Sequence, residues 1–284
     1  MSPDLFVFTI ASDVSKAHRL ISTAHKNNLP IEVCEKTTWT GYADKLTCML
    51  MLLSLESMAP EDYVIFVDAY DVLCYADSQE IIQKFEEMEC DLLIGAELSC
   101  YPAENQLMYD YVYQEQHLLP ATNYRYVNSG GYMGTKKALL DMLQWKPFDE
   151  IYELCELGGD QNYVTQYFLE HVLINPRIRL DHKQQMFQNL HKVELSECSF
   201  RQGRFHNNVL GTWPCFVHFN GYNAYDFQMI HQETGVSEHI MDACLALTET
   251  PGETYWKIPY RVPYVLVYQG IEVTNLPQLH KSLR

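Results

Sequence analysis

The chain contains 284 residues, of which 47% are hydrophobic and 13% aromatic, so it can bury the core of one large α/β domain or two small ones. Twenty basic residues stand against 37 acidic ones, which gives a formal net charge of −17. This charge argues against a nucleic-acid-binding protein, whose surface must be positive. It is compatible with an acidic enzyme that uses a divalent cation.

Three features of the sequence bear on the cellular location. No apolar run approaches the length of about eighteen residues that a membrane span needs, so no transmembrane helix is predicted. The short apolar run 5–11 follows Asp4 and lacks a basic leader, which favours a first strand over a signal peptide. The nine cysteines are scattered and include no C-x-x-C pair, so we expect free thiols and a cytoplasmic protein.

The first hundred residues alternate between strand and helix patterns. Continuous apolar runs predict buried strands, and longer runs that end near Asn or Pro predict helices. In chain order we predict a strand at 5–11, a helix at 15–27, a strand at 31–34, a helix at 44–58, a strand at 63–68, a helix at 78–89 and a strand at 91–96. This order predicts a parallel sheet wrapped by helices.

The alternation stops after Glu97. Residues 98–126 are rich in Tyr, Gln and Asn without a clean period, which is typical of a long functional loop. Further elements are predicted as a strand at 127–134, helices at 136–144 and 161–171, and a strand at 215–218.

The domain organisation follows from the absence of any linker, internal repeat or low-complexity tract. We expect one principal domain, residues 1–235, followed by a C-terminal extension, residues 236–284. The extension contains an amphipathic stretch at 236–247 and an apolar stretch at 260–268. It either packs on the domain's own core or forms the interface of a homodimer.

Two carboxylates follow the buried strand at 63–68. Asp68 ends the strand, and Asp71 lies three residues later in the turn. Ligands of open parallel sheets bind at the carboxyl ends of strands, where two carboxylates suit Mg²⁺ or Mn²⁺. The alternative is that Asp68 caps the strand and Asp71 belongs only to the turn. His218 ends another apolar strand, and a mixed nitrogen and oxygen ligand set favours Mn²⁺.

Small and aromatic residues mark two more segments. Asn128 precedes a pair of glycines, which allow close approach of the backbone to a ligand or form a bulge between strands. Lys45 lies close to Trp39 and near the start of a helix, where the helix dipole favours an anion. A cation at that place is explained if a phosphate lies between the two.

Two other segments leave their roles open. Gly158 and Gly159 predict a turn, and Asp160 is either a cap of the following helix or a site residue. The polar segment 179–189 shows neither a helix nor a strand period, so it either lines a site or forms a solvated loop.

Taken together, these segments resemble the N-terminal glycosyltransferase domain of the multifunctional collagen lysyl hydroxylases. The resemblance covers roughly residues 5–225 and rests on seven motifs in the same order: Trp39…Lys45, Phe66-Val-Asp68-Ala-Tyr-Asp71-Val, Ala96-Glu97-x-x-Cys100-Tyr101-Pro102, Asn128-Ser-Gly-Gly131, Asp160-Gln161, Leu180-Asp-His-Lys183-x-x-x-Phe-Gln-Asn-Leu190 and His218-x-Asn220-Gly221. It implies the α/β GT-A fold, a Rossmann-like, mixed and mostly parallel sheet flanked by helices.

The same resemblance implies an activity. It is the Mn²⁺-dependent transfer of glucose from UDP-glucose to galactosyl-hydroxylysine of collagen or a collagen-like protein, with retention of the anomeric configuration. Retaining glycosidases place two carboxylates across the bond, and no such pair is identified here, so we expect a same-face displacement. Two alternatives remain: transfer of galactose or N-acetylglucosamine to a different acceptor, and a UDP-sugar- or collagen-binding module without catalysis.

Roles for single residues follow from the matching positions. The metal ligands implied by the resemblance are Asp68, Asp71 and His218. The implied donor-binding residues are Trp39, Lys45, Asp68, Tyr70, Asn220 and Gly221, and the implied catalytic residues are Asp160, Asn128 and Tyr101. The sequence departs from the family in a shortened Asp-rich run before Asp160, in a Tyr for the loop Trp at position 101, and in the missing Lys after Gly221. We also expect no hydroxylase domain.

Overall fold

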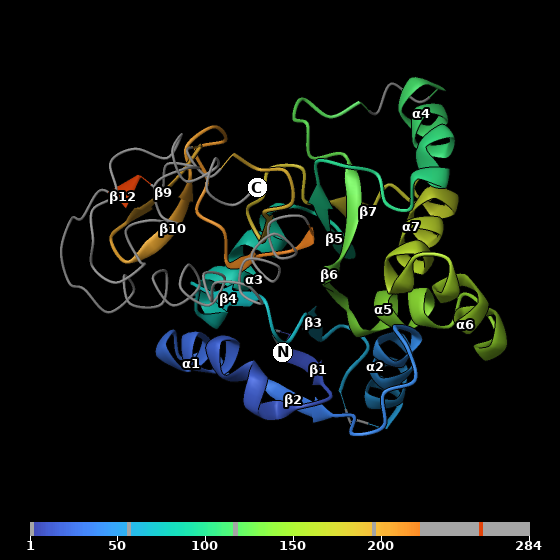
Figure 1. The fold of residues 1–284 in the computed structure, drawn as a ribbon, viewed down its shortest axis with the longest axis horizontal. Helices are drawn as coiled ribbons and strands as arrows, with labels where there is room; N and C mark the ends of the chain where they lie inside the picture. The colour runs from blue at the N-terminus through green and yellow to red at the C-terminus, as the bar shows by residue number, and fades with distance from the viewer. Residues whose placement is uncertain (1–2, 56–57, 116–118, 195–196, 222–255, 258–284) are drawn as a thin grey trace, which may run out of the picture.

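The computed structural model describes residues 3–55, 58–115, 119–194, 197–221 and 256–257. Its centre is a β-sheet with helices on both faces (Figure 1). The strands of this sheet are β1 (Leu5–Ala11), β2 (Glu32–Glu35), β3 (Tyr63–Val67), β4 (Val72–Cys74), β5 (Leu92–Glu97), β6 (Tyr126–Thr135), β7 (Ile178–Leu180), β8 (Phe187–Asn189) and β11 (Phe216–His218). They lie in the order β2-β1-β3-β6-β5-β8-β11-β4, and β7 pairs with β5.

Most neighbouring strands in the sheet are parallel. β1 is parallel to β2 and β3, and β5 is parallel to β7 and β8. However, β6 is antiparallel to both β3 and β5, and β4 is antiparallel to β11. The sheet is therefore mixed and mostly parallel, which confirms the expected GT-A architecture. The four strands predicted in the first hundred residues, β1, β2, β3 and β5, run in the same direction, as the strand–helix alternation predicted, and the antiparallel neighbours come from β6 and β4.

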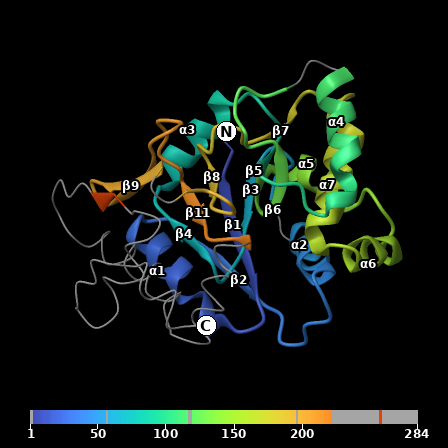
Figure 2. The same cartoon turned by 45° about the horizontal axis from the view of Figure 1, so that its top comes forward.

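Helices cover the two faces of the sheet unequally (Figure 2). The helices are α1 (His18–Lys26) and α3 (Ser78–Glu87) on one face, and α2 (Ala43–Leu55), α4 (Gln106–Glu115), α5 (Lys136–Leu143), α6 (Phe148–Glu156) and α7 (Gly159–His171) on the other. Successive residues of β3 point to opposite cores: Val64 and Phe66 pack on the α2 side, Ile65 and Val67 on the α1 side. Burial on both faces explains the continuous apolar run of this strand.

The segment 98–126 is not a loop throughout, as the sequence had suggested. It contains the short 3-10 helix η2 (Ala103–Asn105) and then α4. Tyr109, Val112 and Tyr113 of α4 are buried, and their spacing of three and four residues is that of one helix face. The helical pattern was hidden because its apolar positions are held mainly by tyrosine. The helix α6 was also not predicted.

A second, three-stranded sheet lies outside the first. Its strands are β9 (Cys198–Arg201), β10 (Arg204–Asn207) and β12 (Trp256–Lys257), in the order β10-β9-β12. Apart from β12, the predicted extension 236–284 lies outside the described residues, and so do its expected helix, apolar strand and homodimer interface. Within the described ranges, no helix is long and apolar enough to cross a membrane, and the eight cysteines are free thiols.

Candidate metal centre

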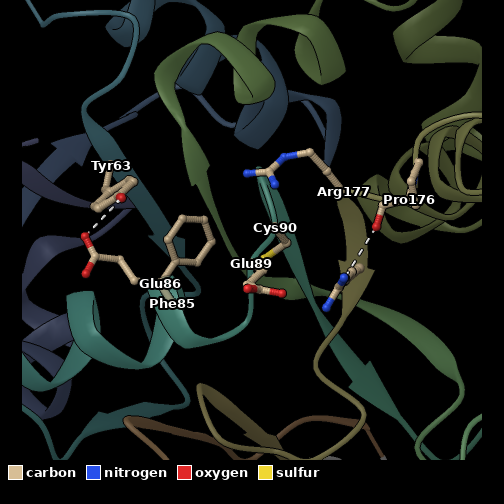
Figure 3. A pocket seen from close by; sticks show the side chains of 8 residues that line it. Tyr63, Phe85, Glu86, Glu89, Cys90, Pro176 and Arg177 are labelled. Carbon is tan, nitrogen blue, oxygen red and sulfur yellow. Dashed lines mark hydrogen bonds between the residues drawn. The ribbon is translucent and has the colours of Figure 1, made fainter.

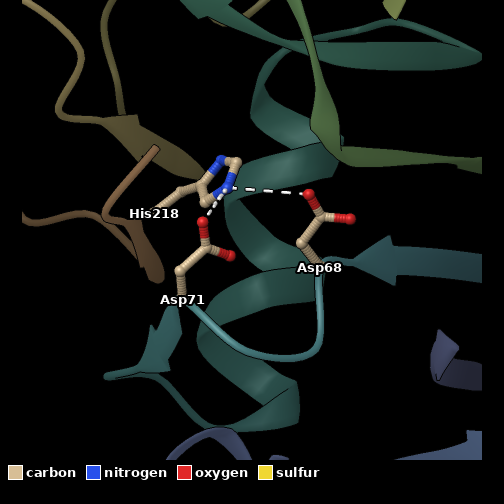
Figure 4. Close-up of side chains that lie close together, drawn as sticks. All are labelled: Asp68, Asp71 and His218. Carbon is tan, nitrogen blue, oxygen red and sulfur yellow. Dashed lines mark ion pairs between the residues drawn. The ribbon is translucent and has the colours of Figure 1, made fainter. Parts of the chain in front are cut away.

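Three side chains meet at one edge of the large sheet (Figure 4). Asp68 follows β3, Asp71 precedes β4 and His218 ends β11. The Nε2 atom of His218 lies 3.3 Å from Oδ2 of Asp71 and 3.7 Å from Oδ2 of Asp68. One ligand atom from each residue lies within 4.8 Å of the other two. The structure thus brings together the three residues that the sequence pointed to as metal ligands.

Backbone pairing places these side chains. The backbone N–H of Asp68 donates to the carbonyl of Gly130 at 2.9 Å, which ties the end of β3 to β6. β11 runs antiparallel to β4, and the N–H of Phe219 donates to the carbonyl of Asp71 at 2.8 Å. This register brings His218 next to Asp71, although the two residues are far apart in the sequence.

The imidazole of His218 is held in one orientation. Its Nδ1 atom lies 3.1 Å from Oδ1 of Asn128 and 2.9 Å from Oδ1 of Asn189. The Nδ2 group of Asn189 donates to the carbonyl of Ala96, which leaves its oxygen towards the ring. With two amide oxygens as acceptors, Nδ1 carries a proton, and Nε2 points towards the two carboxylates, where its lone pair could bind a cation held by all three residues. Such partners orient metal-binding histidines, and this gives Asn128 a supporting role at the metal group, while its catalytic role stays a prediction.

Opposite charges hold the group together. Burial alone would lower the pKa of His218, but the charges of Asp71 and Asp68 outweigh it and raise that pKa. Burial would also raise the pKa of Asp71, yet the neighbouring ring outweighs it and lowers the pKa of this carboxyl. A divalent cation would supply the same attraction, and two carboxylate oxygens with one imidazole nitrogen match the ligands that Mn²⁺ accepts. The residues present therefore fit the expected metal.

Lys45 connects the metal group to α7. Its Nζ atom lies 2.5 Å from Oδ1 of Asp68 and 3.7 Å from Oδ2 of Asp160. Burial would lower the pKa of Lys45, but the two carboxylates outweigh it and raise the pKa above the ordinary value. The cation at the start of α2 is thus balanced by carboxylates within the protein. Asp160 lies in the first turn of α7, whose N-cap is Gly158, so the expectation that Asp160 caps this helix is wrong.

The amide of Asn220 is engaged inside the protein. Its Oδ1 accepts hydrogen bonds from the backbone N–H groups of Leu190 and His191 at 3.0 and 3.1 Å, and its Nδ2 donates to Glu97 at 2.9 Å. Gly221 has a φ of +65°, and a Cβ atom there would lie 2.3 Å from Nδ1 of His191. These contacts hold the backbone that follows His218 in place. Contact of Asn220 and Gly221 with the donor stays a prediction.

Glu97 was not singled out as a site residue from the sequence. It ends β5, is 3% exposed and accepts hydrogen bonds from Asn220 and from Nε2 of Gln161, the latter at 2.6 Å. The oxygen of Gln161 accepts from the backbone N–H of Ser129 at 2.8 Å. Glu97 therefore links β5, β6, α7 and the chain after β11. Burial raises the pKa of Glu97 to about 7, and the hydrogen bonds from Gln161 and Asn220 offset part of this rise.

Replacing Glu97 with glutamine should change how stability depends on pH. The pKa of Glu97 in the folded protein lies above its value of 4.5 in the unfolded chain. The protonated carboxyl therefore makes its full contribution to stability below pH 4.5, and this contribution is lost as the pH rises through about 7. The loss corresponds to about 3 kcal/mol, since one pKa unit is about 1.4 kcal/mol. Glutamine does not titrate. Urea unfolding in metal-free buffer should therefore show a difference between wild type and Glu97→Gln that shifts by about 2.5 kcal/mol between pH 5 and pH 8, since part of the loss already occurs below pH 5. Parallel curves would contradict the elevated pKa.

The aromatic residues implied in donor binding lie at the surface. Trp39, Tyr70 and Tyr101 are 39%, 38% and 57% exposed. The hydroxyl of Tyr70 accepts hydrogen bonds from the backbone N–H groups of Ser12 and Asp13 at 2.8 and 3.0 Å, which ties the turn after β3 to the end of β1. The structure shows no direct contact of these three rings with the metal group among the described residues, so their donor contacts stay predictions.

A pocket of about 510 Å³ lies elsewhere in the molecule (Figure 3). Its lining includes Tyr63 at the start of β3 and Arg177 just before β7, together with Cys90 before β5. It therefore opens at the amino ends of these strands, whereas the metal group lies after the carboxyl end of β3. None of the residues predicted for the site lines it. The chemistry of the site is assigned to the metal group rather than to this pocket.

Comparison with known proteins identifies relatives of this chain. Multifunctional procollagen lysine hydroxylase and glycosyltransferase LH3 of Rattus norvegicus is 33% identical over 167 residues, which are 57% of this chain and 21% of that protein. Procollagen-lysine,2-oxoglutarate 5-dioxygenase of Drosophila melanogaster is 30% identical over 256 residues, 84% of this chain and 33% of that protein. This chain thus spans about a fifth to a third of the length of these relatives.

A solved structure and a family model also match. The apo crystal structure of mouse xyloside xylosyltransferase 1 matches 66% of this chain and 87% of its own, with 14% identity and a TM-score of 0.39. The model of the PLOD GT domain matches residues 1–233. Because this match covers most of the chain, including β1 to β11 and all three members of the metal group, the chain belongs to the glycosyltransferase family of the PLOD GT domain.

Proposed function

We propose that this protein transfers glucose from UDP-glucose to galactosyl-hydroxylysine of a collagen-like protein, in a reaction that requires Mn²⁺. The observation that supports this proposal best is the meeting of Asp68, Asp71 and His218 after the carboxyl ends of β3 and β11 in a member of a glycosyltransferase family. A group of this composition suits a divalent cation that binds a diphosphate. The names of the relatives, which include procollagen lysine hydroxylase and glycosyltransferase, support the choice of acceptor.

The roles of the residues follow from their contacts. Asp68, Asp71 and His218 would hold the metal, and Asn128 keeps the ring of His218 turned so that Nε2 faces the ion. When bound, Mn²⁺ supplies Lewis-acid assistance by neutralising the diphosphate of the departing UDP. Lys45 fixes the carboxylate of Asp68 and places a positive charge beside it.

The proposed transfer retains the anomeric configuration of the sugar. The bond between the sugar C1 and the UDP oxygen breaks, the bond from C1 to the acceptor hydroxyl forms on the same face, and the proton of that hydroxyl passes to the departing diphosphate. A two-carboxylate route would need a free carboxylate as the nucleophile. The two site carboxylates nearest to Lys45, those of Asp68 and Asp160, are both paired with its ammonium group, which favours the same-face route.

A donor panel tests the proposal. Purified protein is incubated with Mn²⁺, a collagen-derived peptide that carries galactosyl-hydroxylysine, and either UDP-glucose, UDP-galactose or UDP-N-acetylglucosamine. We expect acceptor-dependent UDP release and a gain of one hexose on the peptide with UDP-glucose only. Transfer from another donor instead would overturn the glucose assignment. Mn²⁺-dependent UDP binding without transfer to any collagen acceptor would show a binding module.

A further inference from the structure

Two buried polar atoms close to the metal group have no hydrogen-bond partner. They are the hydroxyl oxygen of Tyr132 and Oδ2 of Asp160. The ammonium group of Lys45 lies 3.7 Å from Oδ2 of Asp160, which is an ion-pair distance but too long for a hydrogen bond. Tyr132 is 1% exposed and Asp160 is 4% exposed. Buried donors and acceptors are nearly always satisfied, because leaving one unpaired costs about 1–3 kcal/mol, so each such exception needs an explanation.

The fold places both groups on the face of the sheet that carries Asp68 and Lys45. Tyr132 of β6 pairs with Phe66 of β3, and their rings stack with centroids 5.0 Å apart. Asp68 follows Phe66 by two positions, so its side chain lies on the same face of the sheet as the ring of Tyr132. The ammonium group of Lys45 then joins Asp68 to Asp160 across this face. Tyr132 is thus beneath the ion network that borders the metal group.

A hydrogen-bond donor and an acceptor together are complementary to a hydroxyl group. Burial raises the pKa of Tyr132 well above its ordinary value, and the charges of Asp160 and Asp68 add to this effect. The phenol therefore keeps its proton and can donate a hydrogen bond, whereas a carboxylate oxygen such as Oδ2 of Asp160 accepts one. A sugar hydroxyl does both, since it accepts from one partner and donates to another.

We propose that Tyr132 is a specificity-determining residue for the transferred sugar, whose hydroxyl accepts a hydrogen bond from Tyr132 and donates one to Oδ2 of Asp160. The inference rests on the proposed function, because it places the sugar of the UDP-sugar on the Lys45 side of the metal group. It adds a residue that none of the sequence motifs had marked as functional. A site built to bind a hydroxyl discriminates strongly against a ligand that lacks it.

The variant Tyr132→Phe tests this inference, because it removes one oxygen and keeps the ring that stacks on Phe66. Calorimetric titration with Mn²⁺ present compares the binding of UDP-glucose with that of UDP, which has no sugar. We expect UDP-glucose to bind about 3- to 10-fold more weakly to the variant, as for the loss of one neutral hydrogen bond. The affinity for UDP should change by less than about twofold, since the metal and diphosphate contacts are untouched.

Tyr163→Phe is the matched control. The hydroxyl of Tyr163 is equally buried but donates to the carbonyl of Met142 at 2.9 Å, away from the metal group. This variant should lower the melting temperature and leave both affinities unchanged. Unchanged binding of UDP-glucose by Tyr132→Phe would overturn the inference, and so would an equal loss of UDP and UDP-glucose. If wild type binds neither ligand, the proposed function fails, which is a separate outcome.

Discussion

Replacing His218 or Asp71 with alanine is expected to reduce Mn²⁺-dependent sugar transfer about a thousandfold or more. Each substitution removes one of the three groups that meet within 4.8 Å. In the proposed reaction the metal would stabilise the charge that develops on the departing diphosphate, which contributes several kcal/mol, and about 1.4 kcal/mol corresponds to tenfold in rate. Initial rates of UDP release with a collagen-derived acceptor measure this effect. The affinity for Mn²⁺, measured by calorimetry, should fall in parallel.

His206→Ala is a suitable control for this experiment. His206 is 7% exposed, close to the 5% of His218, and its Nδ1 also lies against an amide oxygen, that of Asn208 at 2.9 Å. It belongs to β10 in the second sheet, so its loss should lower stability without changing Mn²⁺ affinity. Near-normal Mn²⁺-dependent turnover in His218→Ala would refute the ligand assignment. Circular dichroism shows whether each variant is folded.

The meeting of Asp68 and His218 follows from local patterns in the sequence, whereas the direction of a single strand does not. Asp68 and His218 follow apolar runs that both proved to be strands, and the carboxyl ends of parallel strands gather at one edge of a sheet. Their meeting could therefore be anticipated from two local patterns. The antiparallel direction of β6 could not be anticipated, because the apolar pattern of a buried strand is the same whether the strand is parallel or antiparallel to its neighbours.

The polar partners around the metal group depend on tertiary contacts that no local pattern encodes. Asn189 reaches His218 only because β8 pairs with β11 in one register, with Asn189 opposite His218. Glu97 gains its elevated pKa from burial beneath residues of α7 and of the chain after β11. The segment 179–189, left open as a site lining or a solvated loop, supplies β8 and so belongs to the site's support. The compartment and the homodimer stay predictions.

Replacing Gly130 with alanine is expected to disable the metal group without removing a ligand. A Cβ atom at this position would lie 2.1 Å from Cε1 and 2.7 Å from Nδ1 of His218, and 3.0 Å from Oδ2 of Asp68. The φ angle of Gly130 is not in the left-handed region, so the backbone itself tolerates alanine. The imidazole must therefore move, and it then loses the hydrogen bonds from Nδ1 to Asn128 and Asn189.

The expected loss of Mn²⁺ affinity in Gly130→Ala is about 10- to 100-fold, the usual effect of disturbing the partners of a metal-binding histidine. Gly131→Ala is a matched control, because its Cβ atom would lie 2.6 Å from the ring of Phe187, within the core rather than the metal group. Both variants overpack the interior and should lose about 1–3 kcal/mol of stability. Only Gly130→Ala should lose Mn²⁺ affinity per folded molecule, as measured by calorimetry below the melting temperature. If both variants lost Mn²⁺ affinity equally, the metal group would be responding to general overpacking of β6. Normal Mn²⁺ binding by Gly130→Ala would show that His218 does not ligate the ion from this position.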